Sequence, residues 1–170
     1  MRPIPEEIVE RTSEYIADLQ ADAIVEIVNT MADSQPIVFA FLMMTADDYL
    51  NEEEQELLLF LGISIWKMML HVSGENLPEV SDVLLQEKEE LNNKMLTFLA
   101  NDTDPDFIDS VHTIFSNYNQ PEVLRYVVET LMEEDEEFEE EMSEEGKGHM
   151  LICLKTVIDC FDSVETEQPF

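Results

Sequence analysis

The sequence is poor in glycine, cysteine and basic residues, and each shortage excludes a class of protein. Only 4 of the 170 residues are glycine, too few for the frequent turns of an all-β sandwich or barrel. The two cysteines, Cys153 and Cys160, lie two turns apart on one expected helix, which is too far for a disulfide within that helix. We interpret them as small buried side chains of a protein from the reducing cytoplasm.

Basic residues are outnumbered by acids: 8 Lys and Arg stand against 40 Asp and Glu, giving a net charge of −32. A surface of this kind repels nucleic acid and anionic lipid, so neither is an expected partner. The acidity itself has three interpretations, which the sequence leaves open: it keeps the protein dispersed, it attracts a basic partner, or it adapts the protein to high salt. No apolar run is long enough to predict a membrane span, and no signal peptide is recognised.

Apolar residues make up 45% of the chain, enough to build a core, and they recur with helical periodicity. No segment alternates with a period of two for long enough to predict a strand. The sequence therefore predicts a single all-α domain over residues 1–170, a compact bundle or array of about eight helices. Helices are expected at 5–19, 21–33, 36–46, 52–72, 78–100, 105–118, 121–134 and 148–164, with 52–72 and 148–164 the most buried.

An internal duplication is indicated by two similar segments, 35–43 and 120–128, which both begin with Gln-Pro and repeat apolar residues at matching positions. A long apolar helix follows each segment, and these two helices also match. They lie about eight residues further apart in the sequence than the two Gln-Pro segments do. The extra residues then fall in an acidic connection at 133–145. These matches predict two related halves of three or four helices, at 5–74 and 78–165, each burying its apolar face against the other.

The candidate chemistry of the sequence is thin. His71, His112 and His149 stand in three different segments, without the spacing of a helix-based zinc or di-iron site. Serine elbows, phosphate loops and Cys-x-x-Cys motifs are absent. We therefore expect no cofactor or metal, and a non-catalytic cytoplasmic interaction protein, such as an adaptor, a chaperone-like binder or an inhibitor of a basic protein. The alternative is a hydrolase or metal-dependent enzyme whose carboxylates are brought together from several helices.

Two partner-binding surfaces are predicted. The first is the acidic connection 133–145, which has ten acids in thirteen residues and suits a basic protein; its binding residues are predicted to be Glu133, Glu134, Asp135, Glu136, Glu137, Glu139, Glu140 and Glu141. The second is an apolar groove that would accept a partner helix, since flexible thioethers suit variable apolar surfaces; its predicted residues are Phe39, Met43, Met68 and Met69. The other interpretation of this methionine cluster is adaptable packing in the core. The sequence leaves open whether copies of the chain associate.

Overall fold

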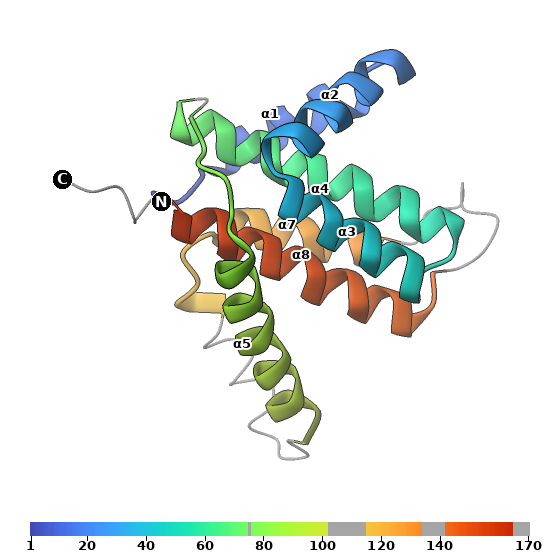
Figure 1. Cartoon of the computed structure of the whole chain (residues 1–170), viewed down its shortest axis with the longest axis vertical. Coiled ribbons are helices and arrows are strands. Elements are labelled where there is room, and N and C mark those ends of the chain that lie inside the picture. The colour runs from blue at the N-terminus through green and yellow to red at the C-terminus, as the bar shows by residue number, and fades with distance from the viewer. Residues whose placement is uncertain (75, 102–114, 134–141, 165–170) are drawn as a thin grey trace.

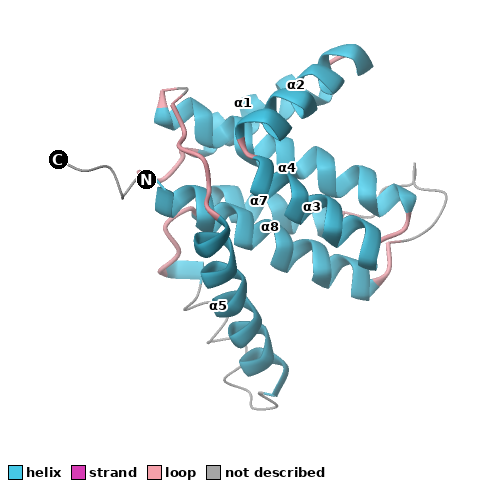
Figure 2. Ribbon diagram, in the orientation of Figure 1, coloured by secondary structure: helices cyan, strands magenta, loops and turns pink. Residues whose placement is uncertain are grey.

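A computed structural model of the chain describes residues 1–74, 76–101, 115–133 and 142–164. Within these ranges all regular structure is helical and no strand occurs, as Figure 2 shows. The all-α prediction is therefore confirmed. The helices are α1 (Glu6–Ala17), α2 (Ala21–Ser34), α3 (Pro36–Tyr49), α4 (Glu52–Ser73), α5 (Asp82–Asn101), α7 (Pro121–Met132) and α8 (Glu144–Val164).

Helix boundaries follow from local chemistry. At the start of α4, Asn51 Oδ1 accepts a hydrogen bond from the Glu54 N–H at 2.9 Å, and the Glu54 carboxylate accepts one from the Asn51 N–H in return. This capping box satisfies two amide groups that the helix itself leaves unpaired. The same helix ends at Gly74, whose φ of +68° suits a residue without a Cβ. Pro36 and Pro121 open α3 and α7, where their fixed φ favours the first helical turn.

Helices α4 and α8 form the middle of the molecule. Figure 1 shows them running side by side, with α3 in front of them and α7 behind. Helices α3 and α5 pack on α8 and on each other, while α1 packs on α4 and α7. Helix α2 contacts α3 and α4 and projects beyond the other helices at the top of Figure 1. The two central helices are thus covered on both sides.

Burial confirms the prediction that α4 and α8 are the most buried helices. Leu58, Leu61 and Ile65 of α4 are all 0% exposed, and so are Leu154 and Phe161 of α8. Full burial of one such side chain contributes about 1.5–3 kcal/mol. The helices with the longest apolar runs are therefore also the ones that the remaining helices cover.

Three helix predictions need correction. The described residues hold seven helices rather than eight. The eighth predicted helix, at 105–118, falls mostly on residues 102–114, which lie outside the described residues. Helix α5 begins at Asp82 and not at 78, because the backbone before it bonds to the side chain of Gln35, the residue between α2 and α3. Helix α8 begins at Glu144, a turn before the expected 148.

Among the described residues, α4 alone is long and apolar enough by itself to cross a membrane, judged by length and composition only. Helices α2 and α3 pass the same test together, but the chain bends by 117° between them. Half of the apolar stretch of α4 is buried inside the protein. Core helices of globular proteins pass this test too, so it is weak support for a membrane span.

Candidate functional site

The predicted acidic surface can be located only at its first residue. Glu133 caps the carboxyl end of α7 and is exposed. The other predicted residues, within 134–141, lie outside the described residues. Their role in binding a partner therefore stays a prediction.

The four residues predicted to line an apolar groove differ in their exposure. Phe39 and Met43 of α3 are half-buried, whereas Met68 and Met69 of α4 are 0% exposed and belong to the core. The two α4 methionines therefore do not line an open surface. The apolar character of α4 on nearly all sides was the signal that they pack inside, because a helix of this kind is covered by its neighbours.

An open apolar groove lies instead between α2 and the first half of α4. Its volume is about 400 Å³. It is lined by Ile24 of α2 and by Glu53, Glu56, Leu57, Leu59, Phe60 and Ile63 of α4. Two carboxylates and several half-buried apolar side chains thus share one surface.

A second cavity, of about 620 Å³, lies where α2, the end of α4 and the chain leading to α5 meet. Its lining consists of Thr30, Ser34, Trp66, Lys67, Leu70, His71 and Leu77. No acid is among these residues, although acids make up 40 of the 170 residues of the chain. Trp66 is the only tryptophan of the chain, and Lys67 Nζ lies 5.2 Å from the centre of its ring, within the range of a cation–π contact.

The side chain of Gln35, the residue before α3, hydrogen-bonds to the backbone of a distant part of the chain, an arrangement that we call a glutamine clasp. Gln35 is 1% exposed. Its Nε2 donates to the Pro78 carbonyl at 2.9 Å, and its Oε1 accepts from the Val80 N–H at 3.0 Å. The side-chain amide therefore pairs with the extended backbone that leads into α5, much as a neighbouring β-strand would.

The glutamine before α7 repeats this arrangement at the start of the chain. Gln120 is also 1% exposed. Its Nε2 donates to the Arg2 carbonyl at 3.0 Å and its Oε1 accepts from the Ile4 N–H at 2.9 Å. Ile4 lies two residues before α1, as Val80 lies two residues before α5. The sequence marked both glutamines only as parts of a repeated Gln-Pro; their bonds to distant backbone were missed.

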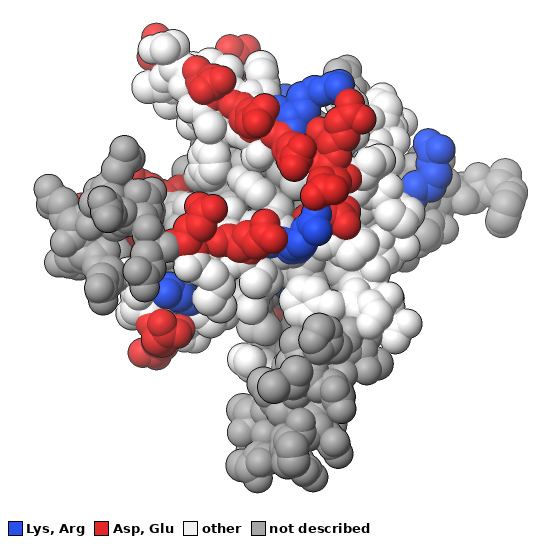
Figure 3. Space-filling view, turned by 180° about the vertical axis from the view of Figure 1, so that it is seen from behind, with Lys and Arg blue, Asp and Glu red and all other residues white. Residues whose placement is uncertain are grey.

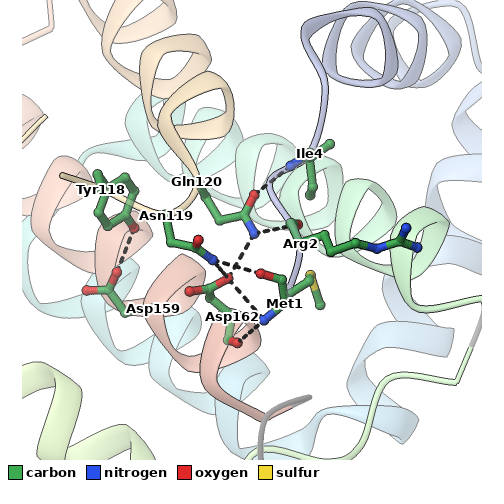
Figure 4. A network of polar contacts seen from close by, with 8 residues as sticks. All are labelled: Met1, Arg2, Ile4, Tyr118, Asn119, Gln120, Asp159 and Asp162. Carbon is green, nitrogen blue, oxygen red and sulfur yellow. Dashed lines mark hydrogen bonds and ion pairs between the residues drawn. The ribbon is translucent and has the colours of Figure 1, made fainter. Parts of the chain in front are cut away.

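Asp162 on α8 extends the second clasp, as Figure 4 shows. Its Oδ1 accepts from Gln120 Nε2 at 2.8 Å and from Asn119 Nδ2 at 2.7 Å. The amino group of Met1 donates to the backbone carbonyl of Asp162 at 3.1 Å and lies 3.7 Å from its carboxylate. The first residues, the start of α7 and the end of α8 are thereby held together.

A further polar cluster joins α5 to α8. Asp159 accepts hydrogen bonds from Asn92, from Lys155 at 2.8 Å and from the Tyr118 hydroxyl at 2.6 Å. Burial, followed by the charge of Asp159, raises the pKa of Tyr118 far above its usual value, so the hydroxyl stays a donor. Because these groups satisfy one another, the cluster serves as a structural clamp between the helices.

The nucleophilic and metal-binding residue types are placed unfavourably for chemistry. Burial raises the pKa values of Cys153 and Cys160 to about 12, so both thiols stay protonated and unreactive. His71 is exposed, His149 stacks on Tyr49 with ring centres 4.0 Å apart, and His112 lies outside the described residues. In the part of the chain that the structure describes, no three His, Cys, Asp or Glu side chains are arranged to hold a metal ion.

No protein-family model, curated protein or solved structure matches this chain. Its function is therefore inferred from its own side chains.

Proposed function

We propose that this protein is a non-catalytic interaction module that binds a basic amphipathic helix of another protein. The groove between α2 and α4 is the observation that carries the proposal. Glu53, Glu56, Leu57 and Phe60 stand at positions i, i+3, i+4 and i+7 along α4 and so share one helix face. Ile24 of α2 closes the groove on the other side.

The side chains of the groove favour a helix with one apolar face and one basic face. Its apolar floor would receive leucine or phenylalanine side chains, which is how helices dock into grooves. The carboxylates of Glu53 and Glu56 would contact lysine or arginine beside that apolar stripe. Figure 3 shows acidic side chains across one face of the molecule, with a few Lys and Arg side chains and uncharged surface among them. A net charge of −32 would also speed the approach of a basic partner.

A titration with a labelled helical peptide tests the proposal. The peptide carries a leucine stripe and lysines on its other positions; a scrambled peptide of the same composition is the control. We expect fluorescence anisotropy to report saturable binding of the first peptide and weaker binding of the scrambled one. The scrambled peptide measures attraction by charge alone.

Matched variants separate the groove from the rest of the acidic surface. The double change Glu53→Gln and Glu56→Gln should weaken binding and reduce its salt dependence, whereas Glu90→Gln on the exposed face of α5 should do neither. Leu57→Ser should weaken binding even at high salt, whereas Val83→Ser, which changes a side chain that is 75% exposed, should not. Equal effects of the groove and control variants would disprove binding in the groove.

We further propose that the chain arose by duplication of a helical unit. The two glutamine clasps support this: Gln35 in the first half holds the backbone before α5, and Gln120 in the second half holds the backbone before α1. The helix packing is reciprocal as well, since α1 packs on α4 and α7 while α5 packs on α8 and α3. A crystal structure tests the proposal: rotating the molecule by about half a turn should place α1 on α5, α3 on α7 and α4 on α8.

A further inference from the structure

We infer that the cavity beside Trp66 binds a small organic carboxylate with an apolar body. This site is separate from the groove of the proposed function, which is lined by other residues. Its volume of about 620 Å³ lies within the range of small-molecule sites. Leu70 and Leu77 supply apolar surface on its wall, and Lys67 and His71 supply the polar side chains that would fix the orientation of a ligand.

The positive charge of Lys67 favours an anionic ligand in this cavity. Within the described part of the chain, Lys67 makes no ion pair, whereas Arg125 and Lys155 are each bonded to carboxylates. The described residues that line the cavity include no acid. At physiological ionic strength the screening length is about 8 Å, so the nearest charges dominate over the distant acids of the surface. Lys67 is therefore a local cation without a counter-ion among the described residues of a strongly acidic protein.

Trp66 lies on the cavity lining and carries a buried donor that the described residues leave unpaired. Trp66 Nε1 is the one buried side-chain nitrogen or oxygen in the described residues without a hydrogen-bond partner. Trp66 is 3% exposed, and a buried indole N–H normally has an acceptor. The hydroxyls of Thr30 and Ser34 already donate to carbonyls of their own helix, at 2.8 Å each. The indole nitrogen of Trp66 is closed off from solvent, so Lys67 and His71 are the side chains left to bind a carboxylate.

The single tryptophan makes the site observable. In a ¹H–¹⁵N spectrum the chain should give one indole cross-peak, from Trp66 Nε1. The probe is 4-phenylbutyrate, titrated into the full chain at physiological salt, with uncharged 4-phenylbutyramide as its match. We expect the acid to shift the indole cross-peak saturably and to bind about tenfold more tightly than the amide, because a charge-assisted bond contributes more than about 1.4 kcal/mol.

Two lysine variants complete the test. Lys67→Met keeps the aliphatic stem and removes the charge, and should weaken binding of 4-phenylbutyrate about tenfold. Lys94→Met removes a charge from an exposed position on α5 and should leave binding unchanged. The inference is overturned if the indole peak does not move, if acid and amide bind equally, or if both lysine variants bind like the original protein. The comparison of acid and amide needs no variant, so it decides the question even if Lys67→Met does not fold.

Discussion

Replacing either clasping glutamine with methionine should destabilise the protein by about 2–3 kcal/mol. Methionine has nearly the same length as glutamine but no amide, so Gln35→Met removes the bonds to Pro78 and Val80 and leaves little empty space. The Val80 N–H is then buried without a partner, which costs about 1–3 kcal/mol. The Pro78 carbonyl loses its bond too, but Pro78 is only half-buried, so water can replace part of that interaction.

Gln120→Met should lower the free energy of unfolding by a similar amount. Gln120→Met leaves the buried Ile4 N–H without its acceptor. It also removes one of the bonds to Asp162, although Asn119 continues to donate to that carboxylate. Free energies of unfolding would be measured by urea denaturation, followed by circular dichroism, with equal m-values as a check that the unfolded states are comparable. The corresponding fall in melting temperature is roughly 4–12 °C.

Gln20 provides the matched control. Like the other two glutamines it stands immediately before a helix, but it is exposed and makes no side-chain capping bond. Gln20→Met should therefore change the free energy of unfolding by less than about 0.5 kcal/mol. The reasoning is refuted if Gln35→Met and Gln120→Met both stay within that margin, because the clasps would then contribute no stability.

Two further predictions concern α8. An alanine Cβ at Gly146 would lie 1.6 Å from Glu54 Oε2, whereas one at Gly148 would meet nothing within 4 Å. Gly146→Ala should therefore lower the free energy of unfolding by about 1–3 kcal/mol, while Gly148→Ala should raise it by about 0.5–1 kcal/mol. Chemical denaturation would measure both changes. Cys153 and Cys160, with pKa values of about 12, should resist a thiol reagent at pH 8 in the folded protein and react once urea unfolds it. Rapid labelling of either thiol under native conditions would contradict this burial.

Most of the helices could be predicted from the sequence because their signals are local. The proline that opens α3, the capping box of Asn51 and Glu54 at the start of α4 and the Gly74 at its end each act within one turn of the chain. The apolar character of 52–72 on nearly all sides then predicted that this helix lies in the middle, since Leu58 and Leu61 had to be covered. These features depend on neighbours in sequence and on the hydrophobic effect, neither of which needs the complete fold.

The candidate sites could not be predicted because they depend on which helices meet. Met68 and Met69 looked suited to a groove, but the packing of other helices around α4 buries both. Val80 and Ile4 carry ordinary backbone amides, and only the fold brings Gln35 and Gln120 to them. The sequence by itself determined the helical segments and their buried faces, since these follow from local periodicity. Tertiary structure decided which polar groups meet and where surface stays open, because residues far apart in sequence become neighbours only when the helices pack.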